Sequence, residues 1–254
     1  MTLPGTGLRR LVAIGLAVGL VAAACGSSTS VPNLPGNLPG TTAGNGGTGG
    51  SSLISGLSSN LDTLTSCQFT ESVSGSQTGG AATPADTGSL QITGTVINTP
   101  TKSMSLNAYG AQYVVIGTQG WTSGDNGSTW MATGATSATL TSLLPNNYYG
   151  TWFDTNATNF KVQGDETKNG VQCVHYKGDS SLGSVYSAIA GVSANFQADL
   201  WVAKDGNYPV SGIYGFSASS GGQAGSFGFS FDITHINDAS NKVTQPANVV
   251  AVPT

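Results

Sequence analysis

Few side chains in this sequence could carry out covalent chemistry, and two of them lie close together. Cys173 and His175 are two residues apart in Val171–Tyr176, a segment whose composition is typical of a β-strand. Residues at this spacing share one face of a strand, so a thiol and an imidazole here could act as nucleophile and base. The same thiol could instead be consumed by a disulfide with Cys67.

Cys25 is the residue at which a different reaction, lipidation, is expected. It follows Arg9 and Arg10, an uncharged apolar run over Leu11–Ala24, and the small residues Ala22-Ala23-Ala24. The run is shorter than the roughly 20 residues of a membrane-spanning helix, but it has the length of a signal-peptide core. The segment resembles the bacterial lipobox, with Ala22 where leucine is usual. We expect cleavage before Cys25 and anchoring by diacylglyceryl and palmitate chains; an ordinary secretory signal and an uncleaved anchor helix are the alternatives.

Composition gives the expected domain boundaries. Residues 1–24 form the signal peptide, residues 25–51 the lipidated cysteine and a Gly/Ser/Pro/Thr tether, and residues 52–254 a single domain. Residues 26–51 carry no charge and little apolar surface to offset the entropy of ordering. Such a tether has a root-mean-square reach of about 25–30 Å.

Lipidation of Cys25 leaves Cys67 and Cys173 as the only thiols of an exported chain. Disulfides persist in oxidising compartments, so we expect a Cys67–Cys173 bond. In the chain-entropy model, a bond that closes this long loop stabilises the folded state by about 4–5 kcal/mol. Two buried free thiols are the alternative, and they would reopen the hypothesis of a Cys173–His175 pair.

Other ionisable groups form no recognisable catalytic or metal-binding pattern. The adjacent carboxylates of Asp165 and Glu166 are expected to point apart into solvent. His235 lies near Asp232 and Asp238 without a motif, and no second ligand pair accompanies Cys173 and His175 for zinc. No G-x-S-x-G or phosphate-binding loop is present. We therefore expect no enzyme, no catalytic residue, no cofactor and no metal.

The charge balance excludes nucleic acid as a partner. The chain has 8 Lys and Arg against 12 Asp and Glu. Removing Arg9 and Arg10 leaves 6 lysines and a net charge of 6 − 12 = −6. No basic stretch remains to neutralise phosphates.

Hydrophobic periodicity predicts an α+β domain. Leucines at helical spacing predict a helix over Ser52–Ser66, and a second helix is expected over Ser181–Val192. Residues 135–155 break the pattern and are interpreted as a short helix and an apolar loop. Alternation predicts strands, with turns at Asp125-Asn126-Gly127 and Lys168-Asn169-Gly170. The predicted strands are 68–73, 87–97, 102–107, 112–117, 159–163, 171–176, 196–203, 208–217 and 223–234.

The order of these motifs resembles the LolA-like lipoproteins of actinobacteria, of the LppX/LprG type. The resemblance rests on Ser66–Phe69, Tyr113–Gly117, Gly170–Tyr176, Ala198–Val210 and Phe231–Asn237, and it covers most of residues 52–246. It implies a strongly curved antiparallel sheet, a half-barrel, with helices covering its concave face. It also implies an apolar cavity that holds lipid acyl chains, and no catalytic residues.

The resemblance favours a lipid or lipoglycan carrier anchored on the extracytoplasmic face of the cell membrane, with an envelope transporter as a handover partner. The residues expected at its ligand site are a lid or mouth and two helix positions: Leu143, Leu144, Tyr148, Tyr149, Trp152, Phe153, Val185 and Ile189. The alternative is a lipid-anchored adhesion or envelope-assembly module with a closed core and no ligand. A tunnel would favour the carrier and a filled core the module.

Overall fold

A computed structural model describes residues 57–78, 90–108, 110–133, 159–178, 193–220 and 223–250, all within the compact unit Gly50–Thr254. Two short helical elements, α2 (Leu57–Asn60) and η1 (Leu61–Thr63), precede the strands. The strands are β1 (Ser66–Thr78), β2 (Leu90–Ile97), β3 (Ser103–Ala108), β4 (Ala111–Ile116), β5 (Gln119–Ser123), β6 (Trp130–Thr133), β7 (Phe160–Lys168), β8 (Val171–Gly178), β9 (Ser193–Ala203), β10 (Pro209–Ser220), β11 (Gln223–Thr234) and β12 (Val249–Val250).

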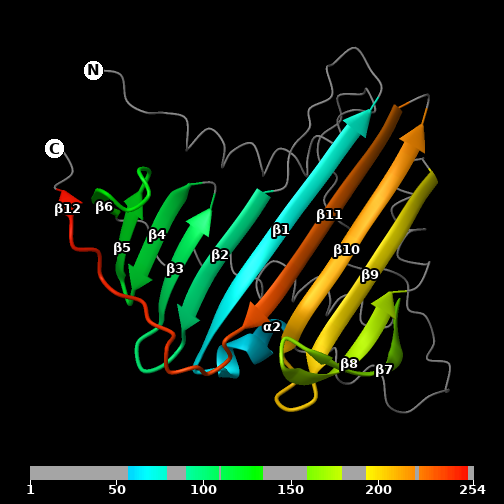
Figure 1. Cartoon of the computed structure of the whole chain (residues 1–254), viewed down its shortest axis with the longest axis horizontal. Helices are drawn as coiled ribbons and strands as arrows, with labels where there is room; N and C mark the ends of the chain where they lie inside the picture. The colour runs from blue at the N-terminus through cyan, green and yellow to red at the C-terminus, as the bar shows by residue number, and fades with distance from the viewer. Residues whose placement is uncertain are drawn as a thin grey trace, which may run out of the picture. The chain divides into compact units, whose positions relative to one another are not determined.

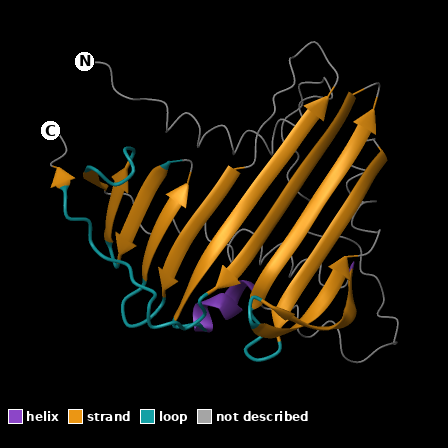
Figure 2. Ribbon diagram, in the orientation of Figure 1, coloured by secondary structure: helices purple, strands orange, loops and turns teal. Residues whose placement is uncertain are grey.

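The strands form one curved, open sheet (Figures 1 and 2). Their order is β12-β6-β5-β4-β3-β2-β1-β11-β10-β9-β8-β7. Every pairing is antiparallel except that of β12 with β6. A strand from the C-terminal part of the chain thus pairs directly with the first, because β11 lies beside β1.

Alternation along each strand separates two faces. In β1, Cys67 and Phe69 are buried in the main core, whereas Gln68 and Thr70, which alternate with them, are only partly buried. Directly paired residues share a face, so the register extends this division across the sheet. We call the face that carries Phe69 the inner face and the opposite one the outer face.

The main hydrophobic core lies on the inner face. Its buried members come from several strands on both sides of β1, from α2, from η1 and from Leu64: Leu57, Leu61, Leu64, Cys67, Phe69, Ile92, Val96, Met104, Leu106, Ala108, Val115, Phe160, Val174, Tyr176, Ala198, Leu200, Val202, Phe229, Phe231 and Ile233. The leucines around α2 and η1 join this core beside the start of β1.

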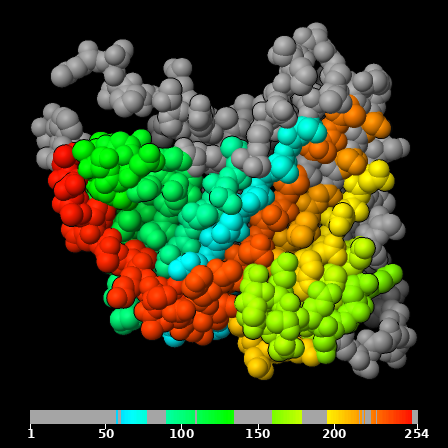
Figure 3. Space-filling model, viewed as in Figure 1, coloured from blue at the N-terminus to red at the C-terminus, as the bar shows by residue number. Residues whose placement is uncertain are grey.

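The outer face is partly covered by residues 235–250, which we call the C-terminal strap. The strap leaves β11 and reaches β6, where the Trp130 amide donates to the carbonyl of Asn248 (Figures 1 and 3). Val243 packs against a small cluster containing Trp121 and Trp130. Asn241 donates to the hydroxyl of Ser66, which fixes the strap to β1.

The tight turns follow the expected chemistry. Asn169 and Gly170 join β7 to β8 with φ of 51° and 79°, and Asn126 and Gly127 have φ of 57° and 83°. Positive φ at both central residues is the requirement of a type I′ hairpin, which explains the Asn-Gly pair between β7 and β8.

The strands predicted from alternation are found, but the helices differ. The predicted helix over Ser52–Ser66 is wrong at its C-terminal end, because η1 ends at Thr63 and Ser66 already pairs with Ile97 in the sheet. Residues 135–155 and Ser181–Val192 lie outside the described residues. The described domain is therefore almost entirely β, and helices covering the concave face are not part of it. Among the described residues, no helix has the length and apolarity needed to cross a membrane.

Candidate functional site

The inner face forms a broad apolar wall whose side chains align in rows across the strands. One row runs from β1 to β8 through direct pairs of the ladders. Its members, in order, are Glu71, Phe231, Gly212, Leu200 and Tyr176. We call this set the Glu71–Tyr176 row. On the other side of β1 the row continues through Ile92 and Ala108.

Two glycines leave space for aromatic rings on this wall. A Cβ built on Gly212 would lie 2.9 Å from Cζ of Phe231 and closer still to Cε1. A Cβ built on Gly94 would lie 2.5 Å from Cε1 and Cζ of Phe69. Each ring therefore occupies the space that a side chain would fill at the glycine of the neighbouring strand.

Glu71 is the one ionisable carboxyl group in the buried part of this wall, within the chain that the structure describes. Its residue is 4% exposed, and its Oε1 atom has no hydrogen-bond partner. Burial raises the pKa of the Glu71 carboxyl from its ordinary 4.5 to about 8. The group is therefore mostly a neutral acid at pH 7, able both to donate and to accept a hydrogen bond.

Tyr176 places a second polar atom on the same face. The residue is completely buried, and its hydroxyl also lacks a hydrogen-bond partner. Burial raises the pKa of this phenol. Glu71 and Tyr176 end the same row four strand intervals apart, about 19 Å along the sheet at roughly 4.8 Å per strand.

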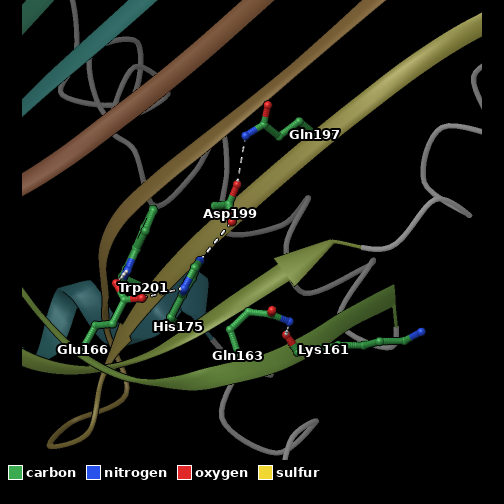
Figure 4. Close-up of polar contacts among 7 residues, drawn as sticks. All are labelled: Lys161, Gln163, Glu166, His175, Gln197, Asp199 and Trp201. Carbon is green, nitrogen blue, oxygen red and sulfur yellow. Dashed lines mark hydrogen bonds and ion pairs between the residues drawn. The ribbon is translucent and has the colours of Figure 1, made fainter.

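A polar cluster lies on the outer face of β7, β8 and β9 (Figure 4). His175 has Nδ1 3.0 Å from Oε1 of Glu166 and Nε2 2.9 Å from Oδ1 of Asp199. Trp201 stacks on the imidazole at 4.5 Å between ring centroids and donates its indole N–H to Oε2 of Glu166 at 2.7 Å. That hydrogen bond, aided by the charge of His175, holds the pKa of Glu166 below its ordinary value. Lys168 lies over the Trp201 ring.

This cluster does not assemble the nucleophile–base pair considered from the sequence. Both ring nitrogens of His175 face carboxylate oxygens. The Cys173 thiol donates to the carbonyl of Val171, and burial foremost raises its pKa, which disfavours the nucleophilic thiolate. The two adjacent carboxylates point apart, as expected, but each has a partner: Asp165 pairs with Lys204 and Glu166 with Trp201.

The structure does not show the predicted Cys67–Cys173 disulfide, since both cysteines are free and buried. Cys67 belongs to the inner-face core, and burial raises its pKa to about 12. Cys173 belongs to a separate cluster on the outer face with Trp201. Their strands are four positions apart in the sheet, whereas a disulfide joins Cα atoms about 4.4–6.8 Å apart. Counting thiols could not reveal that the two project from opposite faces.

The remaining sites expected from the sequence lie outside the described residues. These are the lipidation site Cys25 and the ligand-site residues Leu143, Leu144, Tyr148, Tyr149, Trp152, Phe153, Val185 and Ile189. The residues that sequence reasoning missed are Glu71 and Tyr176. Glu71 could have been found from its position in β1. Alternate residues of a strand share a face, and Phe69 and Val73 lie on the inner face. Among the described residues, no group of three or more His, Cys, Asp or Glu side chains could hold a metal ion.

Solved structures of lipoproteins are similar to this chain at low identity. LprF from Mycobacterium bovis is 12% identical with a TM-score of 0.43, over 78% of this chain and 97% of that one. Lipoprotein LppX from Mycobacterium tuberculosis is 14% identical with a TM-score of 0.36, over 75% and 96%. LppX is of the type that the sequence resembles. A putative outer membrane lipoprotein-sorting protein domain from Vibrio parahaemolyticus is 6% identical with a TM-score of 0.21, over 69% and 87%.

No family model matches the chain, and no curated protein matches it either. The structural likenesses are too distant to carry a ligand or an activity to this chain, whose function is therefore argued from its own residues.

Proposed function

We propose that the domain binds lipid or lipoglycan acyl chains against its inner face, for carriage or transfer in the cell envelope. The observation that carries this proposal is the continuity of the apolar wall from β4 to β8, in which the Phe69 and Phe231 rings lie over Gly94 and Gly212. Ligand sites lined mostly by apolar and aromatic side chains bury most of a ligand's surface, and acyl chains match such a lining. Cys25 would carry the acyl anchor that keeps the domain at the extracytoplasmic face of the membrane.

The near-complete burial of Leu200 and Phe231 also favours the second candidate, an envelope module with a closed core and no ligand. The two candidate functions predict different effects of a charged substitution on the inner face. In a ligand site, the charge is desolvated only when acyl chains are bound, so it lowers lipid occupancy. In a filled core, it is desolvated by folding itself and costs several kcal/mol of a stability of about 5–15 kcal/mol.

Val73→Asp tests this difference, because Val73 is a partly buried inner-face residue packed against the core. Ser72→Asp is the matched control, one residue away on the outer face. The proposal expects Val73→Asp to fold, to keep a cooperative thermal transition and to purify with less lipid than Ser72→Asp. Unfolding of Val73→Asp, together with an absence of lipid from the unsubstituted protein, would favour the closed module.

A further inference from the structure

His175 lies between two carboxylates that come from the strands on either side of its own. Oε1 of Glu166, on β7, is 3.0 Å from Nδ1, and Oδ1 of Asp199, on β9, is 2.9 Å from Nε2 (Figure 4). The three side chains therefore join three neighbouring strands across the outer face of the sheet. We call Glu166, His175 and Asp199 the His175 clasp.

One protonation state of the imidazole satisfies both contacts. A neutral imidazole carries a single N–H, so its other nitrogen would present a lone pair to a carboxylate oxygen. Both carboxylates already act as acceptors of other hydrogen bonds. Oε2 of Glu166 accepts the indole N–H of Trp201, and Oδ2 of Asp199 accepts an N–H of Gln197 at 3.3 Å. The imidazolium donates to both carboxylates, and hydrogen bonds between charged groups are stronger than neutral ones.

The clasp lies where the backbone holds β7 least. β7 ends the sheet and, among the described strands, pairs only with β8. A register shift between Val162 and Gly164 interrupts this ladder, and Gly164 is the residue paired with His175. A bulge disrupts the backbone hydrogen bonds locally, so side-chain contacts supply a larger share of what holds β7 at this point.

The other side chains around the imidazole follow from the register. Trp201 of β9 stacks on it with 4.5 Å between ring centroids, and a tryptophan ring attracts a cation placed on its face. On β10, the residues paired with Trp201 and Asp199 are the uncharged Ser211 and Ile213. The charged or titratable groups of the surrounding strands are Lys161 and Lys168 of β7, Cys173 and Lys177 of β8 and Asp232 of β11.

We propose that the His175 clasp fastens the edge strand β7 in a proton-dependent way: the imidazolium ties β7 to β9, and loss of its proton loosens β7. Histidine is the side chain whose charge ordinarily changes between about pH 5 and 8, so a clasp of this kind responds near neutral pH. β7 also borders the inner face, because Val162 pairs with Tyr176 at the end of the Glu71–Tyr176 row. Loosening β7 would therefore uncover the β8 end of the apolar wall. The clasp itself lies on the outer face and does not depend on the proposed ligand.

Hydrogen exchange of the purified protein, followed by mass spectrometry from roughly pH 5.5 to 8.5, tests this proposal once each rate is divided by the intrinsic chemical rate. A peptide covering β7 is compared with one covering β11, because a pH effect acting through Glu71 would loosen the whole sheet. The variants are His175→Gln, Glu166→Gln and Asp199→Asn, and a cooperative thermal transition establishes that each is folded.

His235→Asn is the matched control. His235 is the only other histidine of the chain, and it is exposed. Its φ of 48° is one that asparagine adopts readily, so the substitution removes an imidazole without backbone strain.

In the unsubstituted protein and in His235→Asn, exchange in β7 should rise about tenfold relative to β11 as the pH rises, the effect of losing a hydrogen bond to a charged group. His175→Gln should exchange rapidly in β7 at every pH. Glu166→Gln and Asp199→Asn should show the rise at lower pH, because one carboxylate fewer stabilises the imidazolium. The imidazole signal that His175→Gln removes from the proton NMR spectrum should shift over the same pH range.

A flat pH profile for β7 in the unsubstituted protein would overturn the proposal. A pH-dependent rise that persists in His175→Gln, or one that His235→Asn abolishes, would overturn it as well. Each of these results would leave the proposed binding of acyl chains on the inner face standing.

Discussion

Glu71 of β1 pairs directly with Phe231 of β11, and the Phe231 ring lies over Gly212 of β10. An acid thus sits in an apolar row, and its Oε1 atom has no hydrogen-bond partner. Burial disfavours the charged form of this carboxyl, so the group stays mostly protonated at neutral pH.

Stability should depend on pH through Glu71. Its pKa is about 8 when folded and near 4.5 when unfolded, so between these values the folded chain binds more protons. The contribution of Glu71 to the free energy of unfolding is therefore fully present below pH 4.5. It is lost as the pH rises to about 8, by an amount on the order of 4–5 kcal/mol. The residues facing it, Phe231, Ile92, Phe69 and Val73, do not titrate. Urea unfolding from pH 5 to 8.5 should show this fall in the unsubstituted protein and a shallower one in Glu71→Gln. Parallel curves for the two proteins would contradict the assignment.

Gly212→Ala should destabilise the domain because the new methyl group would overlap the Phe231 ring. Overpacking of this kind costs about 1–3 kcal/mol. Gly225→Ala in β11 is the matched control, since a Cβ there meets only the Ser76 carbonyl oxygen at 3.6 Å, an ordinary contact. Chemical denaturation should separate the two variants. A Gly212→Ala protein as stable as Gly225→Ala would show that the ring does not lie against this backbone.

Both core cysteines should be free thiols. Burial raises the pKa of Cys67 to about 12 and also raises that of Cys173, so each should react slowly with a thiol reagent in the folded protein. Denaturation without reductant should expose two reactive thiols per chain, which mass spectrometry can count and assign. Finding no labelled thiol in protein isolated from the envelope would restore the Cys67–Cys173 disulfide and require a different sheet register or topology.

Cys25→Ala should abolish lipidation, because the thiol at this position is the group expected to receive the diacylglyceryl chain. The variant should move from the detergent phase to the aqueous phase in detergent partitioning, whereas Ser27→Ala, two residues along the tether, should stay in the detergent phase. A Cys25→Ala protein that still enters the detergent phase would indicate an uncleaved anchor helix in place of the lipid.

The strands were predictable from sequence because a sheet with one covered face imposes alternation, as in Phe229 and Phe231 of β11. The Asn169-Gly170 turn was predictable because its residues tolerate positive φ. Alternation does not predict which strands become neighbours in the sheet. The pairing of β1 with β11 sets the Glu71–Tyr176 row and separates Cys67 from Cys173, and both depend on contacts distant in sequence. Cysteine count alone therefore favoured a bond that the structure does not show.

The His175 cluster shows the same limit of prediction from the sequence. Asp165 and Glu166 were expected to be solvated carboxylates, but register places Glu166 opposite Cys173 and brings its side chain to His175 and Trp201. The sequence motif Cys173–His175 suggested chemistry, whereas the neighbours supplied by β7 and β9 engage both imidazole nitrogens. Local spacing identified the residues, and the sheet determined their partners.

Native mass spectrometry of the protein purified from its own envelope tests the central claim most directly. The account predicts a mass in excess of the acylated polypeptide that disappears on mild organic extraction, with a lipid or lipoglycan that carries acyl chains in the extract. A protein whose mass equals that of the acylated chain before and after extraction, and which takes up no acyl lipid when one is supplied, would contradict it.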